Sequence, residues 1–177
     1  MISFLDVDGV GEHKLYLEGL RLKYSILEKS IPGIRGLDYR ALRSLPLSRR
    51  DRADVLELYS EIFLHNVYFS SFSPKSGLPS PYIRCIYGSE AAFLNLFYRE
   101  AISLSFGFVA LCSAGDGVKI LGSRNYEQIL ELGEPIIALD LFEHAYFKDF
   151  GFRKADYVKT ALSHFDLSLI DKHFSCK

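Results

Sequence analysis

The chain has 177 residues, and 49% of them are hydrophobic, so it can build a compact core and is not intrinsically disordered. Its 21 Lys and Arg residues are balanced by 22 Asp and Glu residues, which gives a formal net charge of −1. A dedicated nucleic-acid binder normally carries an excess of basic residues. Composition therefore argues against a nucleic-acid partner and indicates a globular domain.

The N-terminal residues and the cysteines predict a cytoplasmic protein. The first twelve residues contain no Lys or Arg, so the basic flank of a signal peptide is missing. No apolar run approaches the roughly 20 residues that a membrane span needs. Cys85, Cys112 and Cys176 are far apart and form no CxxC pair, which predicts reduced thiols and argues against a cysteine zinc site.

The N-terminal part is predicted to form a helical hairpin. Apolar residues at helical spacing predict a helix over residues 12–30, which ends before a Pro-Gly pair. Ser48, with Asp51 three residues later, is typical of a helix N-cap, and this second helix should extend to about Phe69. Two long helices joined by a short link predict an antiparallel hairpin.

Residues 70–82 contain five serines, three prolines and one glycine, and this composition indicates a linker. We therefore expect two parts, an N-terminal helical hairpin over residues 1–74 and a C-terminal α+β domain over residues 75–177.

The C-terminal part is predicted to combine helices with a three-stranded antiparallel sheet. Ser89 is a candidate cap for a helix that reaches about Leu104, and the Gly-Asp-Gly at 115–117 predicts a tight hairpin. The whole chain is therefore expected to be an α+β protein. The expected strands are 106–112, 117–122 and 135–142, and a last helix is expected over 155–174.

Asp140 and His144 are the first candidates for chemistry. They lie four residues apart at the end of an apolar strand, so their side chains can converge on one point. A carboxylate and a neutral imidazole suit iron, manganese or zinc. By spacing alone, Asp140 could equally cap the next helix while His144 packs or faces solvent.

The segment Asp140-x-Phe142-Glu143-His144-Ala145-Tyr146-Phe147 resembles the metal-binding signature of the iron/manganese superoxide dismutases at all seven specified positions. The stretch 64–69 is similar to the second-helix motif of that family, with His65 at the ligand position. Residues 88–107 are similar to its middle helix and the glycine that follows. The resemblance covers roughly residues 9–170.

This resemblance implies one iron or manganese ion per subunit, held by three histidines and one aspartate. It implies the conversion of superoxide to oxygen and hydrogen peroxide in a homodimer. Three ligands carry over by position: His65, Asp140 and His144. Tyr24 matches the gateway tyrosine that relays protons, and Glu143 matches the acid that bridges to the partner subunit.

The fourth ligand departs from the family pattern. The family histidine lies eight residues before the gateway tyrosine, and Tyr16 occupies that position here. His13 reaches the site only if the helix changes register, Glu18 matches if the preceding loop is aligned instead, and Glu61 is a further alternative. A tyrosine can ligate ferric iron but would disfavour the ferrous state, so Tyr16 is the first candidate and the sequence leaves the choice among Tyr16, His13, Glu18 and Glu61 open.

The surroundings of the ion also differ from the family. The two positions that supply the family glutamine are Glu61 and Tyr126 here. Because Glu61 shares a helix face with His65, we hypothesise that it replaces the lost ligand or holds metal-bound water. Phe142 replaces part of the tryptophan wall of the pocket. Arg153 and Lys154 are candidates for attracting an anionic substrate.

Three functions fit these patterns. The first is an iron or manganese superoxide dismutase. The second is a degenerate homologue that keeps the fold but acts as a non-catalytic structural or binding subunit. The third is a metalloenzyme that uses the same pocket for other redox chemistry.

Overall fold

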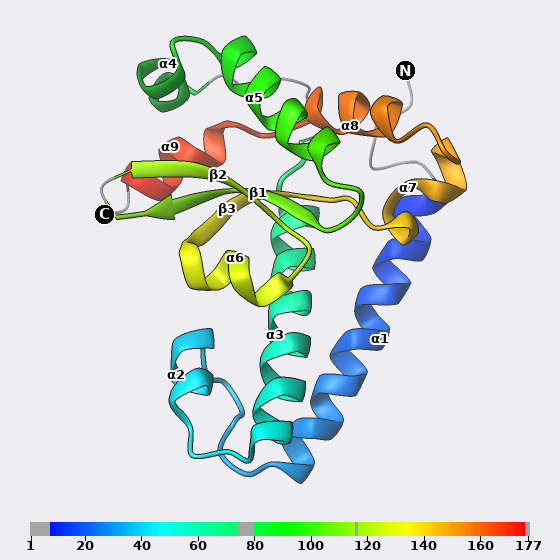
Figure 1. Cartoon of the computed structure of the whole chain (residues 1–177), viewed down its shortest axis with the longest axis vertical. Helices are drawn as coiled ribbons and strands as arrows, with labels where there is room; N and C mark the ends of the chain where they lie inside the picture. The colour runs from blue at the N-terminus through cyan, green and yellow to red at the C-terminus, as the bar shows by residue number, and fades with distance from the viewer. Residues whose placement is uncertain (1–7, 74–79, 116, 176–177) are drawn as a thin grey trace.

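The computed structural model describes residues 8–73, 80–115 and 117–175. Figure 1 shows two long helices, α1 (Asp8–Ser30) and α3 (Arg49–Ser70), which run in opposite directions beneath a part that combines helices and strands. The predicted antiparallel hairpin is confirmed. A short helix, α2 (Tyr39–Ser44), lies in the connection at its base and was not predicted.

The two predicted serine caps are present. The Ser48 hydroxyl accepts a hydrogen bond from the Asp51 N–H at 3.1 Å, at the start of α3. The Ser89 hydroxyl accepts one from the Ala92 N–H at 3.0 Å, at the start of α5 (Glu90–Ser103). Each hydroxyl satisfies a backbone donor that has no partner inside its helix, which fixes where the helix begins.

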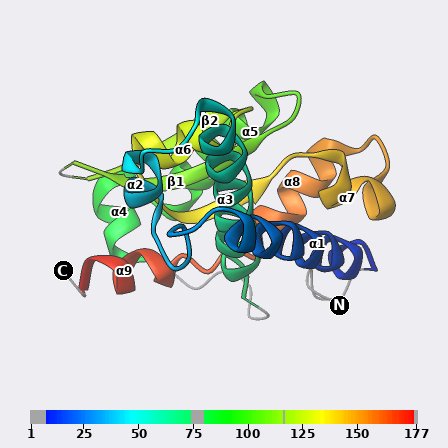
Figure 2. The same ribbon diagram turned by 90° about the horizontal axis from the view of Figure 1, so that it is seen from below.

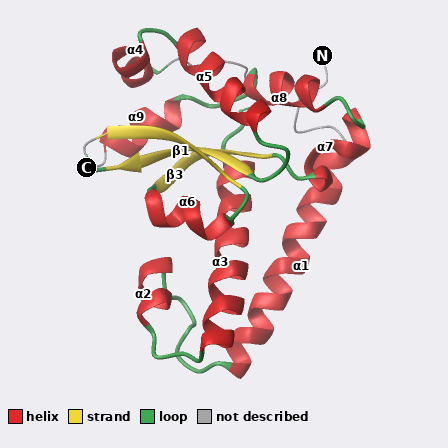
Figure 3. Ribbon diagram, in the orientation of Figure 1, coloured by secondary structure: helices red, strands yellow, loops and turns green. Residues whose placement is uncertain are grey.

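Three strands form the predicted antiparallel sheet, in the order β2–β1–β3. Figure 3 shows this small sheet surrounded by helices. In the pairing of β1 with β3, Phe108 lies opposite Asp140, so the first residue of β1 neighbours the last residue of β3. The strands are β1 (Phe108–Ala114), β2 (Gly117–Ser123) and β3 (Glu134–Asp140).

The helices of the C-terminal part are more numerous and shorter than expected. The predicted helix over 155–174 is wrong as one element, because the structure has α8 (Lys154–Leu162) and α9 (Ser168–Ser175) there. Between them Phe165 is buried and pairs with Phe72 in an isolated bridge, which a continuous helix would not allow. The remaining helices are α4 (Pro81–Tyr87), α6 (Tyr126–Leu132) and α7 (Glu143–Phe150).

Two hydrophobic cores hold the molecule together. The larger one joins the sheet to the C-terminal half of α3 and to α5 and α8, and the smaller one lies at the base of the hairpin beside α2. Figure 2 shows α1 along one side of the molecule. The expected boundary between residues 74 and 75 lies outside the described residues. In the described ranges, no helix is long and apolar enough to cross a bilayer.

Candidate metal centre

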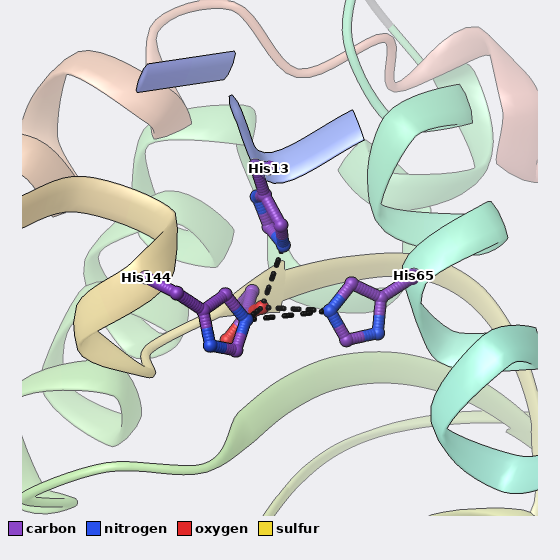
Figure 4. Close-up of side chains that lie close together, drawn as sticks. His13, His65 and His144 are labelled. Atoms are coloured by element: carbon purple, nitrogen blue, oxygen red, sulfur yellow. Dashed lines mark hydrogen bonds and ion pairs between the residues drawn. The ribbon is translucent and has the colours of Figure 1, made fainter. Parts of the chain in front are cut away.

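Four side chains from four different elements converge on one point (Figure 4). His13 comes from α1, His65 from α3 and His144 from α7, while Asp140 is the last residue of β3. Each offers one ligand atom, and these atoms all lie within 4.8 Å of one another. Residues far apart in the chain are thus brought together by the packing of the hairpin against the end of the sheet.

The three imidazoles crowd one oxygen of Asp140. The Nε2 atoms of His144, His13 and His65 lie 2.9, 3.1 and 3.4 Å from Oδ2 of Asp140. The Nε2 atoms of His65 and His144 are themselves 3.4 Å apart. A set of nitrogen and oxygen donors that all point at one small volume is the arrangement expected around a cation.

Asp140 is fixed in place by the backbone around it. Its side chain is fully buried, and Oδ1 accepts a hydrogen bond from the Phe142 N–H at 2.8 Å. Its carbonyl oxygen accepts one from the Tyr157 hydroxyl at 2.7 Å. Burial opposes ionisation, but the close approach of the His13 and His144 imidazoles to its carboxylate outweighs it and holds the pKa of Asp140 well below its usual range. The carboxyl group is therefore charged and ready to bind a cation.

His65 presents an unprotonated nitrogen to the group. Its Nδ1–H donates to the carbonyl oxygen of Glu61 at 2.7 Å, so the lone pair is on Nε2, which faces the other ligands. Burial lowers the pKa of His65, although the charge of Asp140 opposes that shift. Burial also acts to lower the pKa of His144, but its hydrogen bond to Asp140 leaves the pKa raised.

His13 is buried and is the fourth member of the group. Neither of its ring nitrogens has a well-aligned hydrogen bond to any described residue, although Nε2 lies 3.1 Å from Asp140. Buried polar atoms of this kind usually have a partner, and a metal ion at the centre of the group would provide one. Three imidazoles and one carboxylate also fit the preferences of iron and manganese. The residues therefore fit such an ion.

Tyr16, the first candidate for the fourth ligand, lies beside the group rather than in it. Its hydroxyl does not join the group but donates to Oε1 of Glu61 at 2.6 Å. Its ring stacks on His144 with 4.5 Å between centroids. Because Tyr16 lies one helical turn after His13, only His13 is level with the end of β3, and Tyr16 is level with Glu61 on α3. The alternative Glu18 is on the exposed side of α1, where it pairs with Arg21.

Glu61 lies beside the group and is held by a second tyrosine. The Tyr126 hydroxyl, at the start of α6, donates to the same Oε1 atom at 3.2 Å. Phe142 stacks on Tyr126 at 5.4 Å and on His144 at 5.7 Å between ring centroids. Tyr16, Tyr126 and Phe142 thus form an aromatic wall around His144 and Glu61.

Tyr24 lies away from the group. It is eleven residues after His13 on the same helix, about 16 Å along its axis. Its ring packs with Tyr59, 6.2 Å away, in the smaller core at the base of the hairpin. Burial, followed by the charge of Glu28, raises its pKa to about 12. Tyr24 is therefore far from the four donors, whereas Tyr16 lies beside them.

The two expected substrate-attracting residues differ in their surroundings. The ammonium group of Lys154 donates to the backbone carbonyls of Leu104 and Ser105, so it holds the loop before β1. Arg153 is exposed and has Nη1 3.7 Å from Asp156. Glu143 is exposed at the first position of α7.

The spacing from Tyr24 points to Tyr16 rather than to His13, because eight residues before Tyr24 is position 16. A better signal was available in the helix pattern: His13, Leu17 and Leu20 share the buried face of α1. A histidine at the end of such a buried stripe points into the molecule together with its apolar neighbours.

Comparison with known proteins places the chain in a family. Residues 79–173, more than half of the chain, match the family model described as iron/manganese superoxide dismutases, C-terminal domain. An iron superoxide dismutase from Bacteroides fragilis is 25% identical over 166 residues, which cover 89% of this chain and 85% of that protein.

Two further relatives agree. A chloroplastic iron superoxide dismutase from Arabidopsis thaliana is 25% identical over 162 residues, or 86% of this chain and 73% of that protein. A manganese/iron superoxide dismutase from Rickettsia typhi is 28% identical over 124 residues, or 66% of this chain and 59% of that protein. The chain therefore belongs to the iron/manganese superoxide dismutase family.

Proposed function

We propose that this protein is a superoxide dismutase that uses one iron or manganese ion per subunit. The observation that carries the proposal is the group of four buried or half-buried donors, His13, His65, Asp140 and His144, whose ligand atoms lie within 4.8 Å of one another. The bound ion would supply the one-electron chemistry by alternating between its trivalent and divalent states. The chain would convert superoxide to oxygen and hydrogen peroxide.

The four donors have distinct tasks in this proposal. Asp140 supplies the one negative charge, and the hydrogen bond from the Phe142 N–H fixes its orientation. His65 is held by the Glu61 carbonyl so that Nε2 is available for the ion. His13 is the ligand from α1 and takes the fourth ligand position, for which Tyr16 is the first candidate in the sequence.

Tyr16 and Glu61 are proposed to handle protons. Reduction of superoxide to hydrogen peroxide consumes two protons, which must travel from solvent to the buried centre. The Tyr16 hydroxyl is hydrogen-bonded to Glu61, and its ring lies on His144 between the centre and the surface. We therefore assign the gateway role to Tyr16 in place of Tyr24. Glu61 lies outside the group of four, so we assign it a role beside the ion rather than as a ligand.

Three further expectations remain proposals. Arg153 is the better candidate for attracting superoxide, since the Lys154 ammonium group is engaged by backbone carbonyls. A homodimer is proposed with Glu143 at the interface, next to exposed Phe147 on α7. A cytoplasmic location and an N-terminal part ending near residue 74 are likewise proposed.

The test is metal content and activity of the full chain produced with iron or with manganese. We expect close to one ion per chain and competition with cytochrome c for superoxide. His65→Ala should lose both, whereas His164→Ala, a histidine outside the group, should keep both. A stable protein that takes up neither metal would favour a non-catalytic homologue, and stoichiometric metal without dismutation would favour another redox reaction.

A further inference from the structure

A cavity of about 610 Å³ lies beside α2, away from the candidate metal centre. Figure 1 shows α2 and α6 on the same side of α3, and residues of all three helices line the cavity together with the end of β1 and the start of β3. None of the four donors lines it. Small-molecule sites have volumes of about 300–1,000 Å³. The cavity is therefore large enough for a small ligand and is separate from the proposed reaction.

One wall of the cavity is aromatic. Tyr59 and Phe63 are one turn apart on α3, and their rings stack with 6.1 Å between centroids and 23° between planes. The Tyr39 ring of α2 lies 6.4 Å from that of Tyr59. Phe63 is only half-buried, and in the described part of the chain it belongs to neither hydrophobic core. The wall thus offers a flat apolar surface on which a planar ring can stack.

The side of the cavity formed by α2 carries positive charge. Arg40 and Arg43 line it and lie three residues apart, so they are neighbours on the helix surface. Arg43 is held by Glu131, with 3.0 Å between Nη1 and Oε1. The Arg40 side chain is exposed and forms no hydrogen bond or ion pair with the described residues. Arg40 is therefore the charge that remains available to a ligand.

The three acidic side chains that line the cavity are already engaged. Asp38 caps α2, since its Oδ1 accepts a hydrogen bond at 2.8 Å from a backbone N–H of the first turn. Glu131 pairs with Arg43, and Oε2 of Glu134 lies 3.9 Å from Nε2 of His173 on α9. Among the described residues of the cavity, the charge left without a partner is therefore positive.

We propose that this cavity binds a small planar aromatic molecule that carries one acidic group. The ring lies on Tyr59 and Phe63, and the acidic group pairs with Arg40. A carboxylate, a sulfonate and a phosphate all meet this requirement, because each presents oxygen acceptors to a guanidinium group. The proposal does not depend on the metal centre, so its test needs no metal and leaves the proposed function untouched.

Fluorescence titration of the full chain with two dyes tests the proposal. Anilinonaphthalene sulfonate carries one acidic group, and phenylnaphthylamine has the same ring system without it. Arg40→Gln should weaken binding of the sulfonate about tenfold and leave binding of the uncharged dye unchanged. Phe63→Ala should weaken binding of both dyes about fivefold, because both stack on the aromatic wall. Glu131→Gln, which releases Arg43, should tighten binding of the sulfonate alone.

Two exposed residues away from the cavity provide matched controls. Arg50→Gln removes a charge in the first turn of α3, and Phe152→Ala removes a ring that is 90% exposed. Both controls should bind the two dyes as the unchanged chain does. If they lose as much binding as Arg40→Gln and Phe63→Ala, or if Arg40→Gln weakens both dyes equally, the dyes bind elsewhere and the proposal is overturned.

Displacement of the bound sulfonate then identifies the acidic group. Naphthoate supplies a ring with a carboxylate, and adenosine monophosphate supplies a ring with a phosphate. Displacement by either compound that is lost in Arg40→Gln supports the proposal and shows which acid the cavity accepts. Failure of both compounds to displace the dye at millimolar concentration overturns it.

Discussion

At the residue scale, His13 and Tyr16 offer the most direct test of how the centre is built. His13 has both ring nitrogens buried and faces Asp140, whereas the Tyr16 hydroxyl is bonded to Glu61. We expect His13→Ala to lower metal content at least tenfold, because one of four donors is lost. Tyr16→Phe keeps the ring on His144 and should retain the metal while losing turnover. Elemental analysis and a superoxide assay check this, and equal metal loss in both variants would instead make Tyr16 a ligand.

Cys112 provides a second residue-scale prediction, on thiol reactivity. It is fully buried in β1, and burial raises its pKa to about 12, whereas Cys85 on α4 is exposed. The reactive form of cysteine is the thiolate. In a Cys176→Ser background we expect one thiol per native chain to react with a disulfide reagent at pH 8, and a second only after denaturation. Two fast-reacting thiols in the native chain would contradict the burial of Cys112.

The raised pKa of Cys112 also predicts how the stability of the folded chain changes with pH. The unfolded chain releases the Cys112 proton near the ordinary pKa of 9.0, but the folded chain holds it to about 12. The stabilising contribution is therefore complete below pH 9 and is lost as the pH rises toward 12.

Part of the centre could be predicted from the sequence, for a physical reason. Asp140 and His144 belong to one short segment, so their spacing allows them to meet and the family signature marks them as ligands, and His65 comes with a local motif on α3. His13 depends on how α1 is rotated against α3 and on its height along that helix. The buried face that His13 shares with Leu17 and Leu20 indicates the rotation, but no local pattern gives the height along α3, and the tyrosine spacing leads to Tyr16 instead.

At the element scale, Gly107 lies between α5 and the start of β1 and is hydrogen-bonded to the residue that follows Asp140. Its φ is +125°, and a Cβ there would lie 2.2 Å from the carbonyl oxygen of Ser123. Its own carbonyl accepts a hydrogen bond from the Leu141 N–H at 2.8 Å, directly after Asp140. No side chain fits this position unless the backbone moves, and the movement would reach the metal ligand.

Gly107→Ala is therefore expected to lower the free energy of unfolding by about 3 kcal/mol or more and to reduce metal content. Gly115 is the matched control, because its φ is +59° but nothing lies within 4 Å of an added Cβ. Gly115→Ala should cost about 1 kcal/mol and leave the metal in place. Urea unfolding and elemental analysis measure both effects. Similar losses in the two variants would show that backbone conformation alone, and not the contact with Ser123, restricts Gly107.

The length of a helix or strand also limits how well it can be predicted from the sequence. The long helices and the three strands carry enough periodic or apolar residues to be recognised, and serine caps marked where α3 and α5 begin. The short helices α2, α4 and α6 have six or seven residues each, which is two turns or fewer. A segment of that length shows no clear period, and its helical form is decided by the packing around it.

At the scale of the whole molecule, the centre joins the two ends of the fold. The hairpin supplies His13 and His65, the last residue of β3 is Asp140, and α7 supplies His144. Apart from this group, α1 is tied to α7 by an exposed ion pair between Glu12 and Lys148, which contributes little by itself. A metal ion held by all four ligands would therefore cross-link α1 to the rest of the protein.

Metal removal should accordingly destabilise the whole chain. An ion present at a thousandfold excess over its dissociation constant adds about 4 kcal/mol to the folded state. For a protein of this size, that corresponds to a fall in Tm of roughly 8–16 °C when a chelator removes the ion. His13→Ala should show almost none of this metal-dependent difference, whereas His164→Ala should show all of it. Differential scanning calorimetry of loaded and chelated samples gives the measurement. A loaded protein that melts at the same temperature as the chelated one would mean that the ion does not bridge the hairpin and the sheet, because a ligand that binds only the folded state must raise its stability.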